Sequence, residues 1–184
     1  GPDMAAELAE LQSNVPAESA ESARQLIEKD LGATLEQLFA AFDETPMAAA
    51  SIAQVYGAVL PSGERVAVKL RRTGIESRVI TDLEIVQLLA ELIENQSASV
   101  RAYQPVAIVR QFRRTLMREL DFTYEKRNLE EFALHFQEDP NICIPRVYAD
   151  LCSHQIITMD RLEGIPGTDI EALKASGEDL AEFA

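Results

Sequence analysis

Residues 47–70 alternate between apolar and polar positions in a way that predicts two antiparallel strands. A Pro-Ser-Gly turn separates the two halves of this stretch. In the second strand Val66 and Val68 share one face, whereas Ala67 and Lys69 share the other. The lysine therefore reaches over a sheet surface that a small residue keeps open.

Periodic apolar positions before this stretch predict two short helices. Ser19 or Ser22 is a candidate N-cap for the first helix, which Gly32 would end. Thr34 is a candidate N-cap for the second, whose apolar positions extend through Phe42. The pair forms either a lid over the strands or a cover on one face of their sheet.

More helices are predicted after the strands. Apolar residues from Val79 to Ile93 recur at three- and four-residue spacing and predict a helix of about four turns. Residues 95–101 form a polar loop, and Pro105 suits the first turn of the next helix. The apolar face of that helix continues, or starts again in a new helix after a kink, near Phe122.

The last third of the sequence predicts another strand pair. Residues 145–149 and 155–159 have strand composition and flank a turn around Ser153. Asp169 is a candidate N-cap for a final helix. With the first strand pair, these elements predict an α+β fold.

Composition excludes some classes of partner. The 184 residues are 47% hydrophobic, which is enough for a domain with a core. Seventeen basic and 31 acidic side chains give a net charge of −14, which disfavours nucleic acid and anionic membrane surfaces. No apolar run reaches the roughly 18 residues that suggest a transmembrane helix. We expect a location on the cytoplasmic side, with any membrane association through segments outside this sequence.

The cysteines and histidines do not predict a metal site. Cys143 and Cys152 lack the spacing of a metal pair and are interpreted as reduced core thiols, with a disulfide as the alternative. His135 and His154 have no partners at ligand spacing.

Lys69 has two interpretations. It is either a lysine at the end of an edge strand, extended toward solvent, or the phosphate-binding lysine of a kinase nucleotide lobe. The context favours the second, because a loop of small residues, 48–51, precedes the first strand and V-A-V-K follows the turn. Arg71 and Arg72, just beyond, are either phosphate contacts or a solvated pair in a turn.

The loop itself suggests a family. It lacks G-x-G-x-x-G and reads A-A-A-S-I-A-Q-V, followed by G-x-x-V-A-V-K and then R-E-L-D-F. This combination resembles the UbiB or AarF-domain (ADCK-like) family of atypical kinases, which is linked to the biosynthesis of ubiquinone and other isoprenoid quinones. The resemblance runs from about Leu11 to Gly167.

The resemblance implies a fold and a cofactor. The fold is a protein-kinase-like N-lobe, with an antiparallel sheet of about five strands and extra N-terminal and inserted helices. The cofactor is ATP or ADP with magnesium, whose ligands lie outside this sequence. Candidate nucleotide-binding residues are Ala48, Ala49, Ala50, Ser51, Ile52, Val55, Ala67, Lys69, Met159, Asp160 and Leu162. For Met159 the alternative is an ordinary core position.

The candidate catalytic residues are Lys69, Glu119 and Asp121. Glu119 borders the buried face of its helix, about 60° from Leu116, where a carboxylate would orient the lysine. Glu119 and Asp121 also match the E-x-D motif of the family. In the family the E-x-D glutamate pairs instead with the lysine of a K-x-G-Q motif, which is missing here, so Glu125 is a second candidate partner for Lys69.

The resemblance also divides the chain. Residues 1–3 look like a cleavage scar from recombinant expression, 4–45 form a helical extension, 46–162 the nucleotide lobe, and 163–184 the hinge and the start of a second lobe. The sequence contains neither H-x-D-x-x-x-x-N nor D-F-G, which supply the catalytic base and the magnesium ligands. We therefore expect the parent protein to bind and hydrolyse ATP and this piece alone to be inactive.

Several partners remain open. The alanine loop implies an ATPase-like or small-molecule role, with quinone precursors, lipids or quinone-biosynthesis proteins as partners besides ATP. Within the parent, the lobe would contact its own C-lobe; alone, it would self-associate through the exposed surface. The alternatives are a catalytically silent, kinase-like scaffold that binds lipid or proteins, and a plain α+β interaction module.

Overall fold

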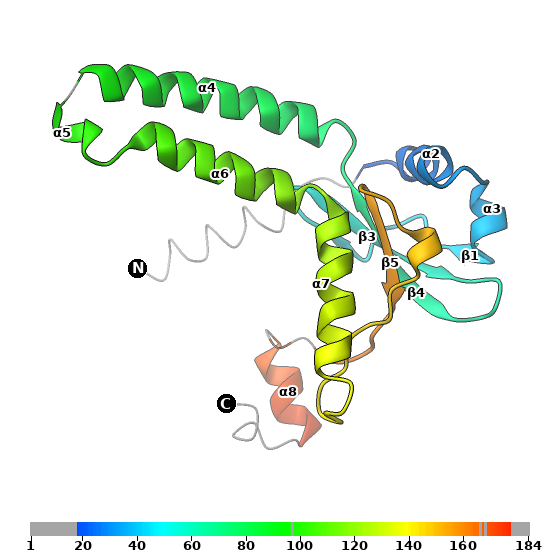
Figure 1. Cartoon of the computed structure of the whole chain (residues 1–184). Coiled ribbons are helices and arrows are strands. Elements are labelled where there is room, and N and C mark those ends of the chain that lie inside the picture. The colour runs from blue at the N-terminus through cyan, green and yellow to red at the C-terminus, as the bar shows by residue number, and fades with distance from the viewer. Residues whose placement is uncertain (1–17, 97, 166, 168, 178–184) are drawn as a thin grey trace.

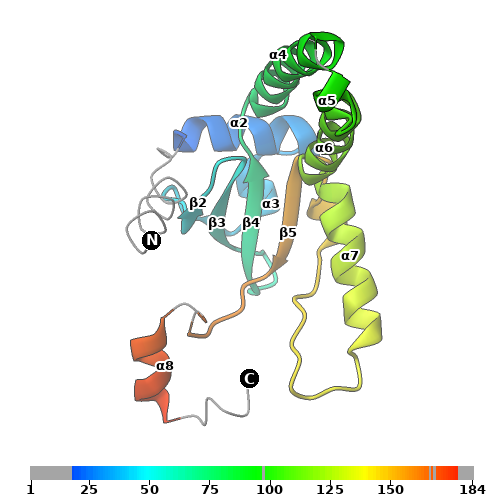
Figure 2. The ribbon, with the colours of Figure 1, turned by 90° about the vertical axis from the view of Figure 1, so that its left-hand side faces the viewer.

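One antiparallel sheet organises the chain in the computed structural model, which describes residues 18–96, 98–165, 167 and 169–177. The sheet has five strands in the order β1-β3-β4-β5, with β2 also paired to β3 (Figure 2). Their bounds are Ala41–Phe42, Ala48–Ala49, Ala53–Val59, Arg65–Arg71 and Ile156–Asp160 for β1 to β5. The predicted fold class is thus confirmed.

The register of β4 gives the sheet two different faces. Val66, Val68 and Leu70 are buried on one face, in the main core cluster. Lys69 lies on the other face, opposite Val55 of β3 and Ile157 of β5. Alternate side chains point to opposite faces of a strand, so the apolar positions dictate where the lysine lies.

Two helices, α2 (Ala20–Leu31) and α3 (Leu35–Leu38), cover the apolar face (Figure 1). The Ser19 side chain accepts from the Ser22 N–H at the start of α2, and Gly32 ends the helix with a φ of 70°. Ile27 of α2 is fully buried against the strands. Of the two predicted roles for this pair, the structure therefore has the cover on one sheet face.

The second predicted helix is wrong beyond Leu38. Phe39 is already extended, and Ala41–Phe42 form β1 along the edge of β3. The Ala40 N–H donates to the Val59 carbonyl at 2.8 Å, so the edge of β3 supplies partners that continued helix would not use. The Phe42 ring also stacks 5.2 Å from the Tyr56 ring.

A helical hairpin projects from the sheet between β4 and α7 (Figure 1). It consists of α4 (Ile75–Gln96), α5 (Ala98–Arg101) and α6 (Pro105–Glu119). With 22 residues, α4 is longer than predicted and includes the start of the expected polar loop. Pro105 occupies the first turn of α6, as predicted.

After a break, α7 (Phe122–His135) begins beside the sheet. The Asp121 carboxylate caps α7 by accepting from the Thr123 N–H at 3.0 Å. The predicted kink near Phe122 is therefore the start of a separate helix.

The last segments differ from the predicted strand pair. Residues 145–149 make only an isolated bridge, Val147 to Met159, because Pro145 lacks an N–H and a 3-10 turn, η1 (Ala149–Leu151), redirects the chain. After β5, α8 (Ile170–Ser176) starts at the predicted cap, Asp169. None of the helices in the described residues is long and apolar enough to cross a membrane.

Candidate nucleotide site

Lys69 forms an ion pair on the sheet face that α2 and α3 leave uncovered. Its Nζ donates to the Oε2 of Glu125 at 2.6 Å and lies 4.8 Å from the centre of the Phe122 ring. The side chains of Lys69 and Glu125 are 24% and 36% exposed, so solvent reaches the pair. The pair is half-buried and accessible to a ligand.

The start of α7 sets this geometry. Phe122 is 1% exposed and packs with Ala53 and Ile157, which fixes the first turn of α7 on the sheet. Glu125 follows one helical turn later and so lies near Lys69. Aromatic contact and ion pair together define the orientation of the ammonium.

Glu119, the first candidate partner of Lys69, does not hold it in this structure. Glu119 is the last residue of α6, and the chain changes direction at Leu120 and Asp121 before Glu125 approaches the lysine. The second candidate, Glu125, is the partner. A sequence signal existed: Phe122 and Leu129, both apolar and seven residues apart, flank Glu125 on a helix.

A cavity of about 480 Å³ contains Lys69 and both acids of the E-x-D motif. The structure thus brings Lys69, Glu119 and Asp121 to one hollow, even though only Glu125 bonds to the lysine. The other lining residues are Thr115, Arg118, Tyr124, Glu125, Asn128, Leu129 and Phe132.

The charges of this cavity are mixed. Three carboxylates, from Glu119, Asp121 and Glu125, face the cations of Lys69 and Arg118. A polyphosphate would be repelled by these carboxylates unless a cation accompanied it. No cluster of three metal-ligating side chains occurs within the part of the chain that the structure describes.

The alanine loop is a short hairpin at the edge of the same sheet. Ala48 and Ala49 form β2 opposite Val55 and Gln54 of β3. The Ala50 N–H donates to the Ala53 carbonyl at 2.8 Å. Ser51 is exposed at the turn.

Arg72 closes this loop. Its Nε donates to the Ala50 carbonyl at 2.8 Å, and its N–H donates to the Ile52 carbonyl at 2.9 Å. Neither prediction for the arginine pair anticipated this contact, because the loop lies twenty residues earlier in the sequence. The loop conformation therefore depends on the side chain of the residue that follows β4.

The remaining predicted nucleotide-binding residues divide into two groups. Val55, Ala67 and Met159 share the face of Lys69, since Ala67 lies opposite Met159 and Val55 opposite Lys69. Met159 also packs against the smaller core cluster, so both of its interpretations are compatible with its place. Asp160 and Leu162 form the second group, at the end of β5 and just after it. Asp160 accepts a hydrogen bond from the Tyr148 hydroxyl at 2.8 Å, and Leu162 is 52% exposed.

An antiparallel sheet with a strand lysine paired to a helix glutamate is the arrangement of a protein-kinase-like N-lobe. A family model described as the ABC1 atypical kinase-like domain matches residues 10–184. The chain belongs to this family, which confirms the identification made from the alanine loop.

Curated relatives carry a consistent name. Proteins named probable protein kinase UbiB are 40% identical over 182 residues in Pseudomonas aeruginosa and 39% identical over 182 residues in Marinobacter nauticus. A third, from Aeromonas hydrophila, is 38% identical over 184 residues. These matches cover 99% to 100% of this chain but only 33% to 34% of the relatives, so the chain spans about a third of their length.

A solved structure supports the fold. It is the complex of Rv3197 with erythromycin from Mycobacterium tuberculosis, which is 28% identical and superposes with a TM-score of 0.73. The match covers 84% of this chain and 38% of the other.

Proposed function

We propose that this chain is the ATP-binding lobe of a UbiB-type atypical kinase or ATPase. We further propose that the whole protein supports the metabolism of ubiquinone, another isoprenoid quinone or a related lipid. The observation that carries the first proposal is the Lys69–Glu125 ion pair on an open sheet face. In kinases such a pair directs the lysine ammonium toward the phosphates of the nucleotide.

The surrounding residues suggest how the nucleotide would lie. The phosphates would meet Lys69 beneath the alanine loop, and the adenine would lie over Ala67 and Met159, which are neighbours across β4 and β5. Backbone groups from Asp160 to Leu162 would complete the adenine contacts. Glu119 and Asp121 would stay near the phosphates, on the cavity wall.

Phosphoryl transfer or ATP hydrolysis would require more residues than this lobe contains. The sequence has no H-x-D-x-x-x-x-N and no D-F-G motif, so it offers neither the usual catalytic base nor the usual magnesium ligands. Lys69 and Glu125 would bind and orient the nucleotide. Transfer or hydrolysis would depend on a second lobe, and the lobe by itself would be inactive.

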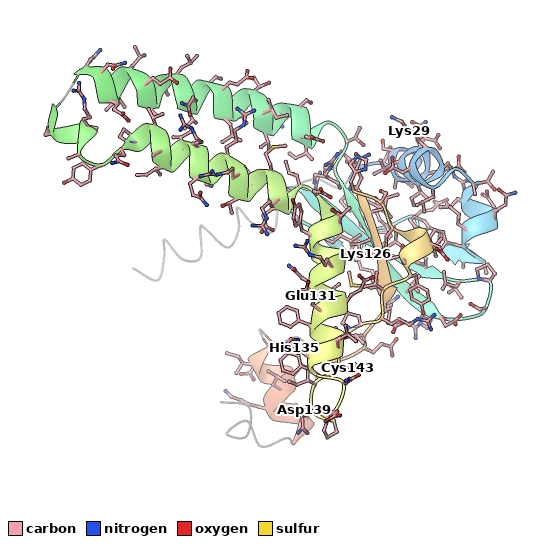
Figure 3. All side chains as sticks on the ribbon, viewed as in Figure 1. Lys29, Lys126, Glu131, His135, Asp139 and Cys143 are labelled. Atoms are coloured by element: carbon pink, nitrogen blue, oxygen red, sulfur yellow. The ribbon has the colours of Figure 1, made fainter. Side chains whose placement is uncertain are left out.

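The test is calorimetric titration of Mg-ADP into a protein that joins this chain to the second lobe of its relatives. The variants are Lys69→Ala, Glu125→Gln and Glu119→Gln, with Lys29→Ala as the matched control. Figure 3 shows Lys29 on α2, on the side of the sheet away from α7. Losing a charge-assisted bond costs about 1.5–3 kcal/mol, so Lys69→Ala should weaken binding roughly 10- to 100-fold.

The other variants rank the two acids. Glu125→Gln should weaken binding about tenfold, Glu119→Gln less, and Lys29→Ala not at all. If the wild-type protein does not bind Mg-ADP at millimolar concentration, the proposal is contradicted and the alternative, a catalytically silent kinase-like scaffold, is favoured. Binding that survives Lys69→Ala would assign the nucleotide to a different surface.

A further inference from the structure

Arg71 is a buried cation at the end of β4. It lies two residues after Lys69, on the same face of the sheet, and only 6% of the residue is exposed. Its Nε is buried without a hydrogen-bond partner. Burying a guanidinium costs desolvation free energy unless its contacts compensate. If this position served packing alone, an apolar side chain would be more stable there.

Its guanidinium contacts three different elements. Nη1 donates to the Leu120 carbonyl, in the joint between α6 and α7, at 2.8 Å. Nη2 donates to the side-chain oxygen of Gln155, just before β5, at 2.9 Å. Nη2 also lies 2.8 Å from the Glu76 carboxylate, in the first turn of α4. One side chain therefore holds both the beginning and the end of the inserted helical hairpin.

The contact with Leu120 lies close to the nucleotide site. Glu125 is five residues beyond Leu120, at the start of the next helix, and it bonds to Lys69 on the same strand as Arg71. Two tethers thus run side by side from β4: Arg71 to the joint and Lys69 to α7. A shift of the joint would carry the first turn of α7, and with it Glu125, away from the lysine.

A second contact at the joint involves the segment before β5. The Phe122 N–H donates to the His154 carbonyl at 3.1 Å, and Gln155 in turn donates to Asp30 of α2 at 3.2 Å. The joint is therefore fixed on one side by Arg71 and on the other by the chain that leads into β5. Arg71 is the member of this set that also contacts α4.

We propose that Arg71 is a positioning residue that keeps Glu125 within bonding distance of Lys69 and links the helical hairpin to the nucleotide site. The nucleotide-binding role of the ion pair rests on the proposed function. The ion pair itself and its link to Arg71 are structural observations. Displacing the hairpin would loosen the pair through Arg71, without any contact at the cavity.

The experiment measures the acylation rate of each lysine in the chain by mass spectrometry, without nucleotide. The bond to Glu125 shields the Lys69 nitrogen from a small acylating reagent, and Glu125→Gln, which weakens that bond, gives the reference increase. Arg71→Gln should raise the rate at Lys69 about fivefold or more, and Arg71→Lys should raise it less. Arg78→Gln, an equal change of charge at an exposed position on α4, should leave it unchanged.

The circular dichroism spectrum separates positioning from loss of fold. Lys29 and Lys174 are exposed in the folded chain, so their acylation rates should be the same in every variant and serve to normalise the reagent. A wild-type rate at Lys69 in an Arg71 variant that keeps its circular dichroism spectrum would overturn the proposal. Because no nucleotide is present, failure of ADP binding leaves this test intact, and failure of this test leaves the proposed nucleotide site intact.

Discussion

The Lys69–Glu125 pair contributes little to stability at its level of exposure. Solvent-accessible ion pairs are typically worth about 0–1 kcal/mol, and each side chain of this pair is roughly a quarter to a third exposed. The bond is short nevertheless, at 2.6 Å, and the Lys69 nitrogen also lies over the Phe122 ring, 4.8 Å from its centre. We infer that the pair matters chiefly for what the ammonium can bind.

The two cysteines should differ in reactivity. Cys143 is exposed, which corrects its assignment to the core, whereas Cys152 is half-buried and free. Burial raises the pKa of the Cys152 thiol, so less thiolate is present at a given pH. At pH 8 iodoacetamide should therefore modify Cys143 first, as peptide mass spectrometry would show.

The rate at Cys152 relative to that at Cys143 should increase as the pH rises, because burial raises the pKa of the Cys152 thiol. Figure 3 shows Cys143 on the loop after α7, beyond Asp139, where reagent has free access. Equal rates at all pH values would contradict the burial of Cys152. Complete unfolding in urea should remove the difference and serves as the control.

Residue roles were predictable where the signal is local. The face of Lys69 follows from the alternation in V-A-V-K, and the structure has it there. The sequence does not decide between Glu119 and Glu125 as the partner of Lys69, because the choice depends on where one helix ends and the next begins. Asp121 decides this by capping α7, a contact that its E-x-D interpretation concealed.

At the scale of elements, α2 depends on its two caps. Ser19 has an extended backbone and accepts a hydrogen bond, whereas Ser22 lies inside the first turn. Replacing an N-cap serine with alanine costs about 1 kcal/mol, whereas alanine inside a helix is favourable. Ser19→Ala should lower the free energy of unfolding by about 1 kcal/mol, and Ser22→Ala should leave it nearly unchanged.

Urea denaturation followed by circular dichroism measures both changes. The slope of the free energy against urea should be the same for both variants and the wild type, because they expose similar surface on unfolding. A larger loss for Ser22→Ala than for Ser19→Ala would contradict the observed cap.

Elements with their own signals were predicted well, and those that depend on a neighbour were not. The β3–β4 hairpin, α2 and the start of α6 follow from alternation, caps and Pro105. In contrast, β1 forms only because β3 offers an edge to Ala41 and Phe42. The contact of Arg72 with the alanine loop likewise exists only once β3 and β4 have paired.

At the scale of the whole molecule, the outer side of α4 is unusually apolar. Apolar residues recur there at three- and four-residue spacing, which places them along one stripe. They are Ile85, Leu88, Leu89, Leu92 and Ile93, each about half exposed or more. Because Leu83 and Ala90 are the buried residues of α4, this stripe is a second apolar face.

The isolated chain should therefore self-associate, since exposed apolar patches of this kind favour association. Sedimentation velocity over a concentration series should show a rising average mass for the wild type. Leu88→Lys should shift the distribution toward monomer, because it places a charge on the stripe. Glu84→Lys, on the same helix but at a position that is already polar, is the matched control.

A chain that stays monomeric at every concentration would contradict this expectation. Equal shifts toward monomer in Leu88→Lys and Glu84→Lys would also contradict it, because both variants make the net charge less negative and so reduce the repulsion between copies. The net charge of −14 opposes contact between copies, so added salt should strengthen association.

The pairing of β4 has a consequence for how the chain folds. One edge of β4 pairs with β3, from which only a short turn separates it. The other edge pairs with β5, which is distant in sequence: Leu70 lies opposite Ile156. Local pairs form quickly, and distant ones must first close a long loop. During synthesis the open edge of β4 therefore emerges long before its partner, and an unpaired strand edge readily joins other chains. Until β5 has been synthesised, a nascent molecule therefore has an open strand edge through which it can pair with other chains.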